Sequence, residues 1–417
     1  MSELRSVRQR WRERPLLWAA LALVAALHAL GAAAPLVAND APLWLSTQQG
    51  WRFPALEAST GFERFLLLLA PWLLALPLWA ASRWCLRTAL VWPALALVAA
   101  CAAELGSSAR TFVPAGEWKR QLGAQPALFA PIPFGRSETN PSEAWRPPTW
   151  LPSSAIDEQG RYVARAAASG GLELPAAPVE VRAGEPARNA MLRHPLGTDA
   201  QGRDLLARVV WGARNSLAVG LVSAALALVL GTLLGALAGW CGGRTDFVVS
   251  RAIELVLCFP VLFLVLLVVS AGTGSVPAVW TISCVLGLSG WTGIARLLRA
   301  ELLRLRQAEF VLAARGLGFS ETRIVLRHAL PNALSPLIVA TSFFTGSAML
   351  AESAVSYLGA GLVEPEASLG ALVRGGTEHA WMVIFPGAVL ALAVVAWNLL
   401  GEELREHGDP RRLERAA

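Results

Sequence analysis

The chain has 417 residues, of which 55% are hydrophobic and 16% are charged, and its formal net charge is +6. A typical soluble domain carries about 25% charged residues and cannot hide this much apolar surface from water. The composition therefore excludes soluble globular, disordered, collagen-like and small disulfide-stapled proteins. The basic residues flank uncharged runs, a pattern that indicates a protein embedded in membrane lipid and argues against a nucleic-acid partner.

The N-terminal part consists of a basic tail over residues 1–15, with five arginines, followed by the uncharged run Leu16–Val37. About 20 apolar residues span the hydrocarbon core of a bilayer. The run is longer than the apolar region of a typical signal peptide, and it ends at Pro35 without an A-x-A cleavage pattern. We therefore expect residues 16–37 to form an uncleaved first membrane helix.

Residues 63–103 contain two further uncharged runs, Phe65–Ser82 and Thr88–Ala103, joined by a link that carries Arg83 and Arg87. Each run is near the length of a membrane span. The pattern predicts an inserted helix pair.

Residues 104–211 carry charges of both signs and many prolines, and no strand or repeat pattern stands out. Long loops cross the membrane regardless of charge, so we expect an extracytoplasmic segment here. One stretch of it resembles a calcium-binding loop, but its twelfth position is Val210 in place of Glu, and a polar turn entering a helix is the alternative. The residues concerned are Asp199, Gln201, Gly202 and Asp204.

Residues 212–403 contain the remaining uncharged runs, and residues 404–417 form a basic tail. One run is twice the length of a span and is interrupted by Gly272–Pro277, so it predicts two helices. The chain as a whole is then an all-α polytopic membrane protein with about eight membrane helices. The runs in this part are Asn215–Gly243, Leu255–Ala295, His328–Ala351 and Ala380–Gly401.

The arginines fix the expected orientation. Arginine-rich segments alternate consistently with eight spans, and by the positive-inside rule all of them lie on the cytoplasmic side. Both termini are then cytoplasmic in a multi-pass protein of the bacterial inner membrane. The segments are the N-terminal tail, the Arg83/Arg87 link, the Arg244/Arg251 link, Arg296–Arg327 and Arg405–Arg415.

Gly231, Gly235 and Gly239 recur every four positions on one helix face. Such a stripe allows another backbone to approach closely, which predicts helix packing inside a bundle. The alternative is that glycine is simply common in membrane helices.

Glu352 lies near the predicted outer end of the helix that begins at His328. Acidic side chains inside a membrane are rare and often functional, so Glu352 is a candidate pathway or helix-packing residue. A carboxylate at the membrane interface is the open alternative.

Catalytic chemistry has no visible place in the sequence. The single lysine, Lys119, follows a tryptophan, so no GxxxxGK[ST] phosphate loop exists. The five histidines show no HExxH spacing, and the five cysteines form no CxxC pair. The sequence predicts no catalytic residue, no metal site and no cofactor.

The loop over residues 298–331, which we call loop 298–331, has the pattern of a helix, a glycine break and a second helix. Gly316 and Gly318 interrupt the first helix, and Ser320 is placed to cap the second. Phe319 and Ile324 stand at hydrophobic-staple positions. Pro331 is expected to end the second helix.

The order Ala313-Ala314, Gly318 and then His328-Ala329-Leu330-Pro331 resembles the EAA loop of ABC importer permeases, which docks on the ATPase subunit. The first Glu of that pattern is Leu312 here, and its Ile is His328. Four longer stretches are similar to the C-type permease subunit of dipeptide, oligopeptide and nickel importers, and they run in the same order. They read HPLGTDAQGRDLLARVVWGARNSLAVG, AGWCGGRTDFVVSR, AESAVSYLGAGL and FPGAVLALAVVAWNLLGEELREHGDPR.

The resemblance implies a six-helix permease core, to which the pair at 63–103 would be an addition. It also implies a heterodimer with a second permease, two ATPase subunits inside and an extracytoplasmic substrate-binding protein. Short stretches at Ala38–Asp40, Gly50–Pro54 and Ala130–Gly135 resemble the oligopeptide branch that includes microcin C uptake. The docking residues it implies are Ala313, Ala314, Gly316, Gly318, Ser320, His328, Leu330 and Pro331.

The resulting hypothesis is a permease subunit that forms half of a translocation path for peptides and makes or breaks no bond itself. Nickel or another small solute is the alternative cargo. A membrane-embedded enzyme and an assembly scaffold are the alternatives from other classes.

Overall fold

The structure is a computed structural model that describes residues 15–39, 42–47, 50–57, 194–271, 277–362, 364 and 366–407, with short stretches between 127 and 148. The inserted pair predicted at 63–103 and most of the segment 104–193 lie outside the described residues.

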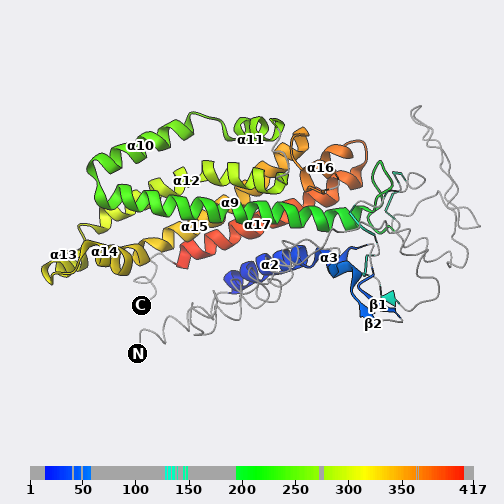
Figure 1. Cartoon of the computed structure of the whole chain (residues 1–417), viewed down its shortest axis with the longest axis horizontal. Coiled ribbons are helices and arrows are strands. Elements are labelled where there is room, and N and C mark those ends of the chain that lie inside the picture. The colour runs from blue at the N-terminus through cyan, green and yellow to red at the C-terminus, as the bar shows by residue number, and fades with distance from the viewer. Residues whose placement is uncertain are drawn as a thin grey trace, which may run out of the picture.

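The described part is a bundle of long apolar helices (Figure 1). Among the described residues, five helices are long and apolar enough to cross a membrane, or six if one bent pair is a single span. The predicted all-α polytopic fold is confirmed, and these six correspond to six of the eight expected spans. The bundle helices are α2 (Pro15–Ala32), α9 (Leu205–Cys241), α12 (Ala278–Leu305), α15 (Leu330–Leu358) and α17 (Ala380–His407), with α10 (Gly243–Leu257) and α11 (Val261–Ser270) as the bent pair.

Helix α9 runs through the middle of the bundle and begins ten residues before the uncharged run at Asn215. Asp204 caps its N-terminus, because the side chain accepts a hydrogen bond from the N–H of Ala207 at 2.7 Å. At about 1.5 Å per residue the helix is roughly 55 Å long, well beyond the 30 Å hydrocarbon core. The helix is therefore long enough to extend past the apolar layer, and its first turns hold the buried side chains of Arg208 and Arg214.

The fifth expected span differs from the prediction. The helix begins at Gly243, not at Leu255, and the run breaks at Cys258–Pro260, where α10 and α11 meet at 73°. Pro260 explains the break, because proline disfavours the helical conformation of the residue before it and cannot donate a hydrogen bond. The predicted interruption at Gly272–Pro277 does separate α11 from α12.

Loop 298–331 folds as α13 (Glu309–Gly316) and α14 (Glu321–Ile324). The expectation that Pro331 ends the second helix is wrong. A π-helical stretch, η2 (Val325–Ala329), follows α14 and leads directly into α15, so that residues 321–358 form one helix. Pro331 is tolerated inside this helix because it directly follows the π-helical stretch, and a local π-helical adjustment accommodates the missing N–H of a proline.

The two ends of the bundle differ (Figure 1). The end formed by α13 and α14 is called the loop end. At the opposite end, called the sheet end, a small antiparallel sheet pairs in the order β2-β1-β3, and α16 (Leu369–Gly375) packs between α15 and α17. The sheet-end elements are α3 (Ala34–Val37), β1 (Trp44–Thr47), β2 (Gly50–Arg52), α4 (Pro54–Glu57) and β3 (Ala127–Leu128).

Two of the short sequence stretches meet at the sheet end. Ala38 pairs with Ile132 in a parallel bridge, and the Nε1–H of Trp211 on α9 donates to the carbonyl of Ala38 at 2.8 Å. Ala38 and Phe134 are buried together beside Trp211. The first membrane helix is thus tied to the start of α9.

Candidate functional site

The turn between α13 and α14 is fixed by its backbone. The N–H of Gly318 donates to the carbonyl of Arg315 at 2.9 Å, and the N–H of Phe319 donates to that of Ala314 at 3.1 Å. This is a Schellman motif, with Gly318 at its left-handed position and a φ of +79°. A Cβ on Gly318 or on Gly316 would meet nothing within 4 Å of this chain. Both glycines therefore face open space.

Loop 298–331 is packed onto the ends of three membrane helices. One hydrophobic cluster joins buried side chains of the loop to α9, α12 and α15, with Phe319 and Val325 packed against it. Ile324 is fully buried there, and Phe319 lies beside the same cluster, as the staple prediction requires. The loop therefore moves with the helices that carry it. The buried members are Trp240, Ile294, Leu298, Leu302, Leu305, Val311, Ala314, Ile324, Ala329, Ala333 and Leu337.

An ion pair braces the two short helices. The Arg315 guanidinium donates to both oxygens of Glu321, at 2.7 and 3.1 Å, and the Nε1–H of Trp240 donates to the same carboxylate at 2.9 Å. The hydrogen bond to Glu321 raises the pKa of Arg315 above its ordinary value. Ser320 has the extended backbone of a capping residue, but its side chain makes no capping hydrogen bond.

The expected docking residues divide between the two faces of the loop. Ala314 is buried, while Ala313, Gly316, Gly318, Ser320 and Pro331 are exposed. His328 stacks on Phe319, with ring centroids 6.1 Å apart, and Leu330 is half-buried. The exposed face also carries Leu312, which occupies the position of the first Glu of the EAA pattern, and three large apolar side chains that the sequence analysis did not name. They are Phe310, Leu317 and Leu326.

The glycine stripe lies against α12. A Cβ on Gly231 would come within 2.5 Å of the Ile294 side chain, and one on Gly235 within 2.7 Å of the carbonyl oxygen of Ala295. At Gly239 the nearest atom is the carbonyl oxygen of Arg299, at 2.9 Å. Real Cβ contacts are essentially never under 3.0 Å, so the approach of the two backbones depends on the missing side chains.

Glu352 is fully buried in the bundle near the sheet end. Four serine hydroxyls donate to its carboxylate, from Ser216 on α9 at 2.6 Å, Ser356 at 2.8 Å, Ser368 at 2.7 Å and Ser353 at 3.3 Å. An enclosed side chain with four donors favours the helix-packing role of Glu352. Its position joins α9, α15 and the start of α16.

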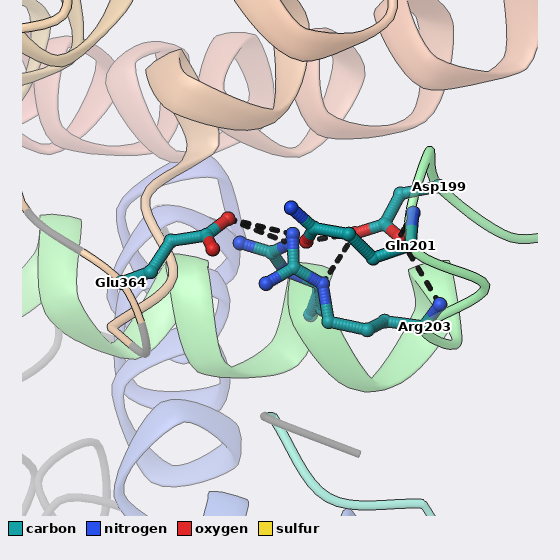
Figure 2. Close-up of polar contacts among 5 residues, drawn as sticks. Asp199, Gln201, Arg203 and Glu364 are labelled. Atoms are coloured by element: carbon teal, nitrogen blue, oxygen red, sulfur yellow. Dashed lines mark hydrogen bonds and ion pairs between the residues drawn. The ribbon is translucent and has the colours of Figure 1, made fainter. Parts of the chain in front are cut away.

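A second polar network holds the sheet end together (Figure 2). One oxygen of Asp199 accepts from the backbone N–H groups of Gln201 and Arg203, and the other accepts from the side chains of Arg203 and Arg208 at 2.7 and 2.6 Å. Arg203 continues to Glu364 at 2.7 Å, in the segment between α15 and α16. The sequence did not mark Arg203, Arg208 or Glu364 as partners.

The interpretation of this turn as a calcium-binding loop is not supported by the structure. Both oxygens of Asp199 are engaged by arginines and backbone N–H groups, and Asp204 is used by the helix cap and by His194 at 2.8 Å. No group of three or more His, Cys, Asp or Glu side chains able to hold a metal ion occurs among the described residues. The turn has the alternative role, that of a polar entry into α9.

Comparison with known proteins identifies the class. Residues 231–413, which include the glycine stripe, loop 298–331 and Glu352, match the family described as binding-protein-dependent transport system inner membrane component. The chain belongs to this family. It is a multi-pass inner-membrane permease subunit of an ABC importer, a non-catalytic component, and the enzyme alternative is set aside on that ground.

Within the family the similarity is to peptide permeases. The oligopeptide transport system permease protein OppC of Haemophilus influenzae is 38% identical over 222 residues, which cover 52% of this chain and 70% of that protein. A putative peptide permease protein of Brucella suis biovar 1 is 37% identical over 226 residues, 52% of this chain and 74% of that protein. Among solved structures, the inward-facing MetNI methionine ABC transporter aligns with a TM-score of 0.42 at 20% identity, covering 49% of this chain and 97% of that one.

Proposed function

We propose that this chain forms half of the translocation path of a peptide importer and couples to a separate ATPase subunit through loop 298–331. The complete transporter contains a second permease subunit, two ATPase subunits and an extracytoplasmic substrate-binding protein. Family membership supports the ATPase and binding-protein partners, since the family is that of binding-protein-dependent systems. The heterodimer and the peptide cargo are part of the proposal.

The observation that carries the coupling role is the way loop 298–331 is seated. Its inner face is buried in one cluster with α9, α12 and α15, whereas its outer face exposes Phe310, Leu312 and Leu317. Clustered apolar side chains on an exposed face mark a protein contact. A partner that pushes on this face displaces three membrane helices through a packed, incompressible core.

Gly318 stands at the centre of the proposed contact. Its φ of +79° suits glycine, and the space beside it is open in this chain. An arginine there projects outward and strains only the turn, at a cost of about 1 kcal/mol. The substitution costs this chain little stability, but its side chain would collide with a partner that lies on the loop. Gly318→Arg therefore tests the docking role selectively.

The loop end is the cytoplasmic side in this proposal, and both termini lie in the cytoplasm, as the arginine pattern predicts. The sheet end then faces the substrate-binding protein. The oligopeptide branch that includes microcin C uptake is part of the proposal, and it is supported by the resemblance of the short stretches at Ala38–Asp40, Gly50–Pro54 and Ala130–Gly135. Peptide cargo is supported by the names of the similar permeases.

The test is uptake of a labelled oligopeptide, with nickel accumulation measured beside it, in cells whose own copy is replaced by a variant at matched membrane abundance. Gly318→Arg is expected to abolish peptide uptake and to lose the ATPase on purification. Gly375→Arg at the sheet end is the control for ATPase retention, because a Cβ there also meets nothing within 4 Å.

Gly316→Arg separates the effect of backbone strain from that of a collision with the ATPase. The site of Gly316 is as open as that of Gly318, but Gly316 does not have a positive φ, so a side chain there causes no backbone strain. Normal peptide uptake by Gly318→Arg with the ATPase still bound would refute the docking role. Unchanged peptide uptake with lost nickel uptake after deletion of the gene would refute the peptide assignment.

A further inference from the structure

A pocket of about 490 Å³ opens at the loop end, between the end of α12 and α13. Its lining combines hydrophobic walls with basic groups, namely Leu303, Arg306, Gln307, Leu312 and Arg315. Leu303 and Leu312 are exposed, with 36% and 53% of their surface open, although each lines a concave site. Of these pocket residues, only Leu312 belongs to the EAA-like pattern described from the sequence.

The two arginines of the pocket differ in their partners. Arg315 is committed to Glu321, which it holds through two hydrogen bonds. The guanidinium of Arg306 forms no hydrogen bond or ion pair with the described part of the chain. Its nearest acidic attraction is also toward Glu321, whose oxygens are already engaged by Arg315 and Trp240. Glu321 is thus shared between Arg315 and Arg306, and the three groups together leave one net positive charge beside the pocket.

Neighbouring charged residues add to the positive electrostatic potential of the pocket. Residues 296–331 contain seven arginines and three glutamates, a formal balance of +4. Glu301 is paired with Arg304 on the exposed side of α12, and Glu309 is the acidic residue that begins α13. A basic pocket with apolar walls favours a carboxylate carried on a protein surface that can also cover the leucines.

The depth of the pocket decides between a protein partner and a lipid headgroup. The uncharged part of α12 ends at Ala295, and the helix continues to Leu305, which adds about 15 Å. The headgroup layer on one side of a bilayer is about 5–8 Å thick. With α12 along the membrane normal, this length places the pocket beyond the headgroups, where a soluble subunit reaches it more readily than a lipid does.

We propose that this pocket receives an acidic side chain of the ATPase subunit, with Arg306 as its charge partner and Leu303 and Leu312 covering its stem. This inference rests on the proposed coupling role of loop 298–331. It adds a second contact, in which the direction of insertion is reversed. In the contact at Gly318 the permease projects toward the ATPase, whereas here the ATPase inserts into the permease.

The experiment measures ATPase binding to the full-length permease, assembled with its second permease subunit in nanodiscs, over a range of salt concentrations. Arg306→Glu is expected to raise the dissociation constant at least about tenfold at low salt, because it places like charges together. Arg306→Lys retains most of the affinity. Arg304→Glu is the matched control, since Arg304 lies two residues away, is exposed and does not line the pocket.

A photo-crosslinking residue at Leu312 identifies the occupant directly. A crosslinked ATPase peptide that contains an aspartate or glutamate supports the proposal, and crosslinking to phospholipid or to the second permease overturns it. Wild-type affinity of Arg306→Glu overturns it as well. If Gly318→Arg loses the ATPase while Arg306→Glu retains it, the coupling role stands and the pocket assignment falls. If neither variant loses it, both fall.

Discussion

Glu352 and its four serines provide a quantitative test of what holds the bundle together. Ser353 and Ser356 lie on the same helix as Glu352, whereas Ser216 on α9 and Ser368 at the start of α16 reach it from other elements. Hydrogen bonds between membrane helices contribute about 0.6 kcal/mol on average and at most about 1.7. Two such bonds give about 1–3 kcal/mol for the attachment of α9 and α16 to α15.

Glu352→Ala is therefore expected to lower the free energy of unfolding by about 1–3 kcal/mol, plus the cost of the space left behind. Ser216→Ala is expected to lower it by about 1 kcal/mol. The control is Ser347→Ala, because the Ser347 hydroxyl is exposed and donates to the carbonyl of Phe343 on its own helix, at 3.1 Å. That change leaves stability near the wild-type value.

The assay is equilibrium unfolding of the purified subunit in mixed micelles, read by helical circular dichroism for each single variant and for the double variant. The double-mutant cycle between Ser216 and Glu352 isolates their interaction. A coupling energy of zero, or equal stability of Ser216→Ala and Ser347→Ala, refutes the idea that the buried carboxylate joins these helices.

Two further predictions concern packing and topology. Gly235→Ala is expected to destabilise the subunit by about 1–3 kcal/mol, because the added methyl meets the Ala295 backbone, whereas Gly293→Ala, whose Cβ meets nothing within 4 Å, has no such cost; equal unfolding midpoints would contradict the packing role. A cysteine at Thr139, in a background without other cysteines, is expected to react with a membrane-impermeant maleimide in intact cells, and reaction only after permeabilisation of the inner membrane would overturn the proposed orientation.

The sequence predicts the membrane helices well where composition alone decides them. Uncharged runs mark the spans of α2, α12, α15 and α17 because the bilayer excludes charge over about 20 residues. The same rule misplaces the start of α10 at Leu255, because that helix begins among charged residues outside the apolar layer. It also misses the first ten residues of α9, where Arg208 and Arg214 are buried against protein.

The candidate sites also differ in how much of them the sequence predicts. The turn at Gly318 can be predicted from the sequence, because a Schellman motif is local and needs a residue that tolerates positive φ. The partners of Glu352 cannot be predicted, because Ser216 is 136 positions away and no sequence pattern indicates that the two residues are close. The pairing of Arg203 with Glu364 cannot be predicted for the same reason, because the two residues are 161 positions apart and meet only through tertiary contacts.

The unbroken helix from Glu321 to Leu358 has a mechanical consequence. Its first residues belong to the loop that the ATPase is proposed to contact, and Glu352 stands near its far end. A rod of 38 residues is about 57 Å long and transmits axial rotation as well as displacement. In the proposed docking arrangement, a twist imposed at the loop end therefore reaches the serines around Glu352, which hold α9, α15 and the start of α16 together.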